Sequence, residues 1–269
     1  MTNALEVKGL RKSYGEKVVL KGIDLYVRRG DIFALLGVNG AGKTTTLECI
    51  EGLRKYDGGT ISVNGRIGIQ LQSAALPAHI KGGEAVRLFA KWNRKPADTS
   101  MLAALGVDSI ANKQYQAMST GQKRRLHLAL ALICDPDIVF LDEPTAGLDI
   151  EGRISLHEYI RNFKAQGKTI ILASHDMAEV ESLCDSIAIL RDGEIAFAGT
   201  VIALTEKIGK HYNIQIRTGQ GLETYESDDI RASLITILKS YEEKDTVIQD
   251  IRVDRGSLEQ HFLKIAKGE

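Results

Sequence analysis

Short apolar runs alternate with amphipathic segments through the middle of the chain, a pattern typical of a parallel sheet covered by helices. Uninterrupted apolar runs of strand length occur within residues 32–36, 137–143 and 168–175. Each run leads into glycine-rich or polar residues at its end. Because ligands of such sheets bind beyond the carboxyl ends of the strands, the pattern predicts a parallel α/β sheet with a binding site at that edge.

An antiparallel, half-solvated sheet is predicted ahead of the first apolar run. Apolar and polar residues alternate there with a period of two, and glycines interrupt the alternation. The alternating segments are residues 6–10, 17–20 and 23–27. Two further strands around a turn are predicted at 60–65 and 66–71.

The chain also contains two blocks of different character. Residues from about 74 to 134 have helical spacing and no strand pattern, so we expect a helical subdomain set into the α/β core. From about residue 205, two alternating stretches enclose a helical one, at 213–217, 246–252 and 230–241. We therefore predict a main domain at residues 1–204 and a small α+β extension at 205–269.

Composition excludes several classes of protein. The chain has 269 residues, of which 43% are hydrophobic and 26% charged, as in ordinary globular proteins. Lysines and arginines equal aspartates and glutamates at 35 each, so bulk charge does not favour nucleic acid or anionic lipid. Three separated cysteines predict free thiols rather than disulfides. No apolar run approaches the ~18 residues of a membrane span, so we expect a soluble chain, with any membrane crossing made by another protein.

Residues 37–44 fit the pattern G-x-x-x-x-G-K-[ST] and lie between a predicted strand and a predicted helix. Glycines let successive backbone N–H groups point inward, and the helix N-terminus favours an anion. Lys43 is expected to reach the β- and γ-phosphates of a nucleotide, and the Thr44 hydroxyl to bind Mg²⁺. The alternative is a glycine-rich turn with an incidental Lys-Thr pair, which the flanking strand and helix disfavour. The predicted fold is thus a P-loop NTPase core with an antiparallel β subdomain, an inserted helical subdomain and the α+β extension.

Polar residues at two other strand ends extend this candidate site. Asp142 follows four apolar residues, where a nucleotide-binding sheet places the carboxylate that holds Mg²⁺. Glu143 is able to deprotonate an attacking water. His175 ends the next buried run and is expected beside Glu143. Two adjacent acids alone would be as consistent with a solvated turn; the phosphate loop makes the catalytic interpretation the better one.

Two further features are ambiguous by themselves. Residues 118–122, Met-Ser-Thr-Gly-Gln, open a leucine-rich helix with Ser119 as an N-cap residue, which alone indicates an ordinary helix start. Tyr14 could stack on an adenine, but a single tyrosine is more often core or surface filler.

Together these motifs make the chain resemble the ATP-binding subunits of ABC transporters over roughly residues 5–200. In that resemblance residues 37–45 are the Walker A loop, 118–122 the signature, 138–143 the Walker B strand and 146–149 the D-loop. It implies an Mg²⁺-dependent ATPase whose ATP-binding residues are Tyr14, Gly37, Val38, Asn39, Gly40, Ala41, Gly42, Lys43, Thr44 and Thr45. It implies catalytic roles for Lys43, Gln72, Glu143 and His175, metal binding by Thr44, Gln72 and Asp142, and a D-loop role for Asp149.

The resemblance also implies partners. Two ATP-binding subunits, identical or different, sandwich two ATP molecules head to tail, so Ser119, Thr120, Gly121 and Gln122 would contact the ATP held by the partner. A separate integral-membrane permease is implied, with this chain on the cytoplasmic face of the membrane and no nucleic acid bound. Residues 256–263 are similar to the "SLE-x-x-F" tail of ABC-2-type exporter subunits.

Two departures from the family pattern stand out. Thr120 replaces the commoner glycine of the signature, and we expect activity to survive. At residues 81–84, Lys-Gly-Gly-Glu lacks the hydroxyl of a Thr-x-x-Glu capping box, so we expect a loosely held helix start.

Two rival functions remain open at this point. A non-transport ABC ATPase acting on DNA or ribosomes usually carries long coiled-coil insertions or two fused ATPase halves, neither of which occurs here. A P-loop kinase or a regulatory module without turnover would not need residues 119–122 or Asp149.

Overall fold

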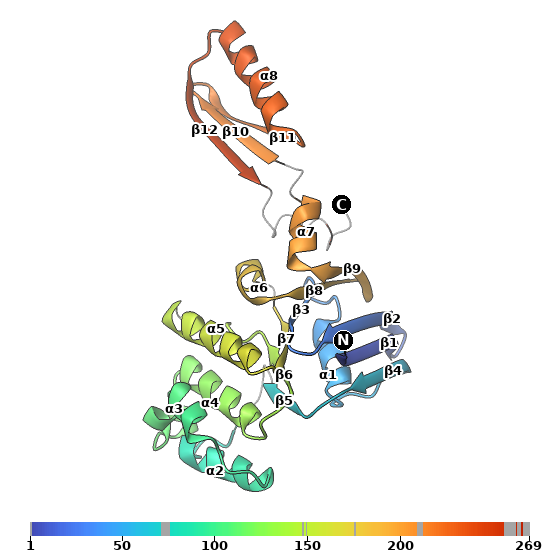
Figure 1. Cartoon of the computed structure of the whole chain (residues 1–269), viewed down its shortest axis with the longest axis vertical. Helices are drawn as coiled ribbons and strands as arrows, with labels where there is room; N and C mark the ends of the chain where they lie inside the picture. Colours follow the sequence, from blue (N-terminus) through green and yellow to red (C-terminus); the bar gives the residue numbers. More distant parts are fainter. Residues whose placement is uncertain are drawn as a thin grey trace. The chain divides into compact units, whose positions relative to one another are not determined.

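The computed structural model describes residues 2–70, 76–146, 148, 150–174, 176–208, 212–255, 262 and 265 of the chain. The chain divides into two compact units, Met1–Ala198 and Gly199–Glu269 (Figure 1). The boundary predicted after residue 204 stays a prediction.

The predicted parallel sheet is the centre of the first unit. Its strand order is β5-β6-β7-β3-β8-β9, and the pairs β5–β6, β6–β7, β7–β3 and β3–β8 are parallel. The strands are β3 (Ile32–Leu36), β5 (Ile67–Gln70), β6 (Ile138–Asp142), β7 (Thr169–Ala173), β8 (Ser186–Arg191) and β9 (Glu194–Thr200). Every residue of β3 and β7 is buried, as expected for strands covered on both faces. The order places β7 between β6 and β3, so the ends of these three strands are neighbours.

An antiparallel sheet of order β2-β1-β4 packs against the same core. The alternating segments predicted at 6–10, 17–20 and 23–27 join into two long strands, β1 (Asn3–Tyr14) and β2 (Lys17–Arg28), with β4 (Gly58–Val63) beside β1. Gly9 and Gly22 have positive φ and lie at register shifts of the β1–β2 ladder, so glycine bulges let the strands continue where the alternation breaks. The consecutive strands β4 and β5 pair in different sheets.

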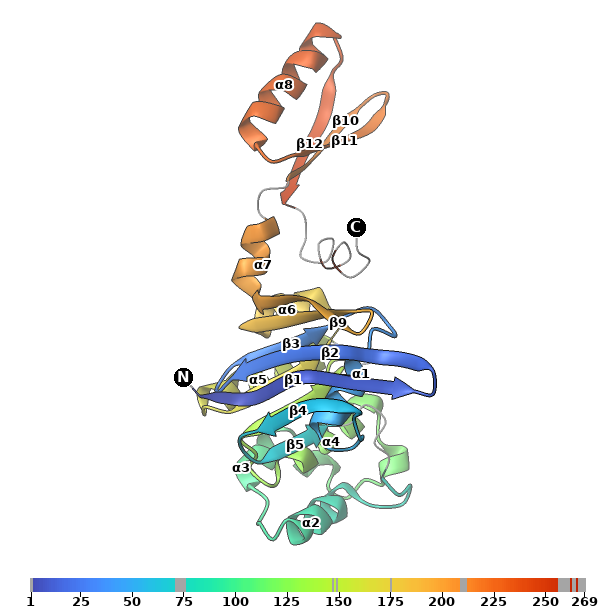
Figure 2. The same cartoon turned by 90° about the vertical axis from the view of Figure 1, so that its right-hand side faces the viewer.

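Helices fill the space around the sheets (Figures 1 and 2). Helix α1 (Lys43–Ile50) contributes Leu47, Cys49 and Ile50 to a buried cluster shared with strands of both sheets. The helical subdomain contains α2 (Gly82–Trp92), α3 (Thr99–Ala104) and α4 (Thr120–Leu132), with short 3-10 turns at Asp108–Ile110 and Tyr115–Ala117, and lies beside β5. Helices α5 (Ile150–Ala165) and α6 (Met177–Leu183) complete the unit.

The start of α2 is held more firmly than its sequence indicates. The Glu84 carboxylate accepts a hydrogen bond from the Lys81 N–H at 2.9 Å, so one half of the capping box remains. The N–H groups of Gly82 and Gly83 donate to backbone carbonyls of Lys113 and Ala111. A Cβ on Gly82 would lie 2.7 Å from the Ile110 carbonyl oxygen. The two glycines therefore permit close backbone packing, and the expectation of a loosely held start is wrong in that respect.

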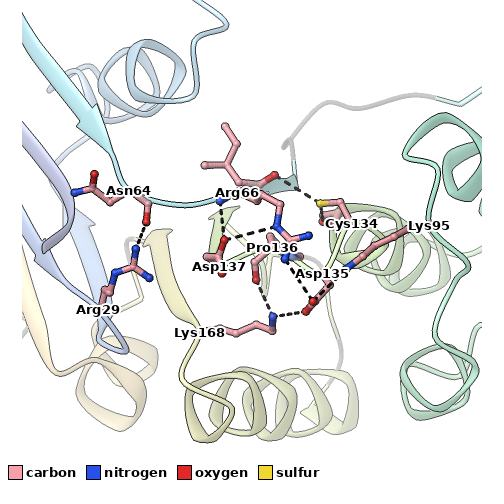
Figure 3. Close-up of polar contacts among 11 residues, drawn as sticks. Arg29, Asn64, Arg66, Lys95, Cys134, Asp135, Pro136, Asp137 and Lys168 are labelled. Carbon is pink, nitrogen blue, oxygen red and sulfur yellow. Dashed lines mark hydrogen bonds and ion pairs between the residues drawn. The ribbon is translucent and has the colours of Figure 1, made fainter. Parts of the chain in front are cut away.

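Charged residues lie in contact at the amino ends of β5, β6 and β7 (Figure 3). The phosphate loop follows the carboxyl end of β3. The Asp137 carboxylate accepts from the Arg66 N–H at 2.8 Å, just before β5. Asp135, with φ of 50°, contacts Lys168 and Lys95, which lie before β7 and after α2. The Lys168 ammonium is the main cause of the lowered pKa of Asp135. These contacts fix where three strands begin and tie the helical subdomain to them.

The second unit is a small α+β fold with a sheet of order β11-β10-β12. It contains α7 (Val201–Ile208), β10 (Tyr212–Thr218), β11 (Gly221–Ser227), α8 (Ile230–Glu243) and β12 (Ile248–Arg255). Its buried cluster consists of Ile214, Ile216, Ile237 and Tyr241. Strand β11 was not predicted, because its residues are mostly polar and exposed.

None of the described helices is long and apolar enough to cross a membrane. All three cysteines are free thiols, and Cys49 and Cys184 are buried.

A glycine in β5 gives a test of this packing. A Cβ on Gly68 would lie 2.3 Å from the Ala131 carbonyl oxygen at the end of α4 and 2.8 Å from the Pro136 ring. Gly68→Ala should therefore lower the free energy of unfolding by about 1–3 kcal/mol through overpacking. Gly58→Ala is the matched control, since its Cβ meets nothing closer than 3.8 Å. Urea denaturation that gave equal midpoints for the two variants would contradict the packing of α4 on β5.

The carboxylate after α1 gives a pH-dependent test. Burial, with the nearby Asp142 and Glu48 carboxylates, raises the pKa of Glu51 from 4.5 to about 7. The folded state thus holds this proton more tightly than the unfolded state, so the free energy of unfolding falls as pH rises from about 4.5 to about 7. Glu51→Gln should remove that loss and gain about 1–2 kcal/mol relative to wild type between pH 5 and pH 8.

The control for Glu51 is Glu16→Gln, at an exposed position of the same unit. Denaturation at several pH values measures both variants. Parallel pH profiles for wild type and Glu51→Gln would show that Glu51 titrates normally.

Candidate functional site

The phosphate loop connects the buried strand β3 to helix α1 and has the conformation that its glycines predict. Gly40 and Gly42 adopt φ of 84° and 109°, which other residues rarely adopt. A Cβ on Gly37 would lie 2.6 Å from the Leu190 carbonyl oxygen, and one on Gly42 would lie 2.9 Å from the Leu20 side chain. The loop is therefore pressed against β8 and β2 at its ends, and its middle is left free to curl around an anion.

Lys43 is buried, with 9% of its surface exposed, and its ammonium faces this loop. The Nζ atom donates a hydrogen bond to the Gly37 carbonyl oxygen at 2.6 Å. Burial lowers the pKa of Lys43, and the carboxylates of Glu143 and Asp142 oppose that effect. An anion such as a phosphate that enters the loop would stabilise the charged form of this buried lysine.

The two carboxylates at the end of β6 share a cleft with the loop, as predicted. The lining of this cleft consists of Val19, Asn39, Gly40, Gly42, Lys43, Thr44, Thr45, Asp142 and Glu143. Burial raises the pKa of Asp142, and the neighbouring Glu143 carboxylate adds to the effect. The cleft thus combines a phosphate-binding backbone, a cation and two carboxylates, a set of groups able to bind and hydrolyse a phosphate ester.

Glu143 has an unusual backbone conformation, and two hydrogen bonds hold its backbone in place. Its φ is 46°, in the left-handed region that non-glycine residues adopt uncommonly and at some energetic cost. Its N–H donates to the Ala173 carbonyl at 2.9 Å, at the end of β7. Its own carbonyl accepts from the Arg124 guanidinium at 2.5 Å.

Arg124 is a site residue that the sequence analysis missed. It lies on α4, five positions after Ser119, and burial lowers its pKa while Glu143 and Asp142 oppose the shift. A basic residue at the start of a leucine-rich helix was visible in the sequence, but its partner nineteen residues away was not.

Val19 is a second residue that the sequence did not reveal. The β1–β2 register shifts between the pairs Lys12–Leu20 and Ser13–Val18, so Val19 forms a bulge. Bulges re-aim side chains, and Val19 accordingly lines the cleft. Tyr14, predicted to stack on adenine, is 41% exposed. The Lys12 Nζ and Arg54 Cζ atoms each lie 5.3 Å from the centroid of its ring. It is not part of the cleft lining.

The signature residues line a different pocket from the phosphate loop. Ser119 caps α4 by accepting from the Gln122 N–H at 3.3 Å, and the Gln122 side chain accepts from the Ser119 N–H at 3.1 Å. Ser119, Gly121 and Gln122 line a pocket with residues of α5, and no residue of that lining belongs to the cleft of Lys43. Thr120 is the first residue of α4 and is exposed.

Three predicted site residues, Gln72, Asp149 and His175, lie outside the described residues. The residues on either side of Asp149 and His175 are described. Ser174, which precedes His175, is buried and donates to the Glu179 carboxylate at 2.6 Å. Burial raises the pKa of Glu179, and Ser174 opposes the shift.

Comparison with known proteins gives consistent matches. A family model described as "ABC transporter" matches residues 20–146. The Nod factor export ATP-binding protein I of Ralstonia nicotianae is 38% identical and the match covers 77% of this chain and 71% of that protein. The linearmycin resistance ATP-binding protein of Bacillus subtilis is 34% identical, and the match covers 79% of this chain and 74% of that protein. The daunorubicin resistance ATP-binding protein of Streptomyces coeruleorubidus is 30% identical, with 97% and 95% covered.

Solved structures agree with these matches. An ATP-binding subunit of an ABC transporter superposes with a TM-score of 0.70 at 29% identity, over 77% of this chain and 93% of its own. The ADP conformation of another ATP-binding cassette has a TM-score of 0.67 at 21% identity, over 77% and 95%, and supports the α/β P-loop fold alone.

The predicted resemblance is confirmed by the relatives, and the predicted fold by the solved structures. The chain belongs to the ABC transporter ATP-binding protein family, and it is an ATP-binding, ATP-hydrolysing subunit that energises a separate permease.

Proposed function

We propose that Glu143 acts as the general base of ATP hydrolysis and that Lys43 and the loop backbone bind the β- and γ-phosphates. The observation that carries this proposal is the single cleft shared by Lys43, Asp142, Glu143 and the phosphate loop. Glu143 directly follows strand β6 and lines the cleft, where its carboxylate can accept the proton of a water that attacks the γ-phosphate. Developing negative charge is stabilised by the Lys43 ammonium and by loop N–H groups.

The residues present also fit Mg²⁺. Thr44 and Asp142 supply a hydroxyl and a carboxylate oxygen in the same cleft, and Mg²⁺ prefers oxygen ligands completed by water and substrate phosphates. Thr44 and Asp142 would therefore hold the ion, together with Gln72 as the resemblance predicts. When bound, Mg²⁺ neutralises phosphate charge.

We propose further that two chains form the complete site. Ser119 and Gly121 line a pocket separate from that of Lys43, so one chain does not bring both sets of groups to one cleft. Helix α4 offers its N-terminus there, which favours an anion. A head-to-tail pair of ATP-binding subunits, identical or different, would place this helix start on the ATP of its partner, with Asp149 in the D-loop between them.

The transport role is proposed to be export. The relatives named above include Nod factor export and drug-resistance ATP-binding proteins, and one of them matches nearly the whole chain. We therefore assign this chain to an ABC-2-type exporter, on the cytoplasmic face of the membrane beside its permease. The identity of the cargo depends on the permease.

Replacement of the general base tests the assigned chemistry. Glu143→Gln keeps the shape of the side chain and removes the proton acceptor, so steady-state ATP hydrolysis should fall about 10²–10⁴-fold. ATP binding should survive, and the variant should accumulate as an ATP-bound dimer in size-exclusion chromatography. Hydrolysis at the wild-type rate would show that another group is the base.

The contact between Arg124 and the Glu143 carbonyl gives a second test. Arg124→Met keeps the apolar stem and removes the donor, so Glu143 should lose its fixed position and the turnover rate should fall about tenfold or more, the equivalent of about 1.5–3 kcal/mol for a charged hydrogen bond. KM for ATP should change little, because Arg124 is a positioning residue. Arg124→Lys should restore part of the rate.

Lys123→Met is the matched control for Arg124, since Lys123 instead lies 4.9 Å over the Tyr115 ring. A raised KM with unchanged turnover in Arg124→Met, or an equal loss in Lys123→Met, would contradict the positioning role.

A further inference from the structure

A buried carboxylate outside the nucleotide cleft contacts three segments of the first unit. Glu179 lies in the first turn of α6 and is only 2% exposed. It lines neither the cleft of Lys43 nor the pocket of Ser119. Carboxylates are almost never buried to this extent without partners, because taking a charge out of water is costly. The partners of Glu179 therefore indicate what the buried charge does.

The end of β7 is the first segment that Glu179 holds. Ser174 directly follows β7 and is buried, and its hydroxyl donates a hydrogen bond to Glu179 Oε2 at 2.6 Å. This length is typical of a hydroxyl that donates to an ionised carboxylate. The preceding residue, Ala173, supplies the carbonyl that accepts from the Glu143 N–H. The side chain anchored by Glu179 is thus next in sequence to the carbonyl that holds Glu143.

The turn after β6 is the second segment. Thr145 is buried and follows Glu143 by two residues, and its side chain acts on the Glu179 carboxylate more weakly than Ser174 does. Glu179 therefore contacts residues on both sides of the Glu143 backbone. That backbone has a left-handed conformation, which persists only where the surrounding structure holds it.

Helix α5 is the third segment. His157 Nε2 lies 3.6 Å from Glu179 Oε1, too far for a hydrogen bond but within reach of an ion pair. Among the described residues, neither atom has a hydrogen-bond partner. One turn earlier on α5, Arg153 pairs with Asp176 at 3.1 Å, and the Asp176 N–H donates to Ser174 Oγ at 3.1 Å. Two side chains of α5 thus support the same junction.

We infer that Glu179 is a positioning residue for ATP hydrolysis, whose carboxylate fixes the end of β7 and the turn after β6 and so keeps Glu143 aimed into the nucleotide cleft. The inference rests on the proposed role of Glu143 as the general base. Because Glu179 lies outside the cleft lining, its loss should lower the turnover rate and leave KM for ATP nearly unchanged.

The protonation of Glu179 gives this role a pH dependence. Burial raises the pKa of Glu179, and the effects of Ser174 and His157 oppose the shift. The other titratable groups that act on it or feel its charge are Asp176, before α6, and the buried Cys184 thiol, at the end of α6. Glu179 thus takes up a proton at a higher pH than an ordinary glutamate. Its hold on Ser174 should weaken there, and turnover should fall on the acid side.

Glu179→Gln separates positioning from folding, because it keeps the side chain's size and removes its charge. A neutral acceptor holds Ser174 less firmly, so turnover at neutral pH should fall about three- to tenfold, with KM unchanged. The acid limb of the turnover profile should move to lower pH, since an amide takes up no proton there. The raised pKa means that ionised Glu179 lowers the free energy of unfolding at neutral pH, so the urea midpoint of the variant should stay equal or rise.

Glu179→Met and Ser174→Ala remove the two ends of the hydrogen bond. Each should lower turnover by about tenfold or more, a larger loss than in Glu179→Gln. The double variant should lose little beyond either single variant, because both changes break one contact. Glu181→Gln is the matched control, at an exposed position of the same helix, and should leave turnover and its pH profile unchanged.

Hydrogen exchange of the backbone amides at residues 142–146, without nucleotide, reads the positioning directly. Protection of the Glu143 amide should fall in Glu179→Met and in Ser174→Ala, and stay at the wild-type level in Glu181→Gln. Unchanged protection in the first two variants, losses of turnover that multiply in the double variant, or an acid limb that does not move in Glu179→Gln would overturn the proposal. Lost protection with wild-type turnover would instead support the contact and contradict the assignment of Glu143 as the base.

Discussion

The hydrogen bond from the buried Lys43 ammonium to the Gly37 carbonyl is the interaction on which the nucleotide site depends. It fixes a desolvated cation at the carboxyl end of β3, with Asp142 and Glu143 near enough to oppose the lowering of its pKa. Three features of the fold make this possible: fully buried strands, glycines that bring the loop against β8, and the strand order that places β7 between β3 and β6. The resulting cleft holds its charged groups in fixed positions through packing and backbone contacts, which favours electrostatic catalysis.

A hydrogen bond connects the signature helix to the backbone of Glu143 within one chain. Arg124 lies on the helix that Ser119 begins, and its guanidinium holds the backbone of Glu143 in a left-handed conformation. Ser119 is proposed to contact the ATP of a partner chain, whereas Glu143 is proposed to act on the chain's own ATP. Any movement of α4 that follows partner binding would thus reach Glu143 through the hydrogen bond from Arg124.

Sequence periodicity predicted the main elements of this structure, and spacing predicted the phosphate loop and the carboxylates that share its cleft. These features are local, because glycine conformations and strand ends are encoded by neighbouring residues. The strand order, the partner of Arg124 and the bulge at Val19 depend on contacts between distant segments, so one sequence could not supply them. The polar strand β11 was not predicted for a related reason. Its position beside β10 comes from strand pairing, and its own sequence has no apolar alternation. At Gly82 and Gly83 the sequence suggested backbone freedom, and the structure shows close packing instead.

The cleft of Lys43 is proposed to be half of an ATPase site, with a second chain supplying the rest. The most direct measurement is the rate of ATP hydrolysis per chain over a wide range of protein concentration, at saturating ATP and Mg²⁺. If two chains complete each site, the rate per chain rises with concentration and levels off as dimers saturate. A rate per chain that stays constant down to concentrations at which sedimentation shows only monomers would mean that one chain holds a complete site.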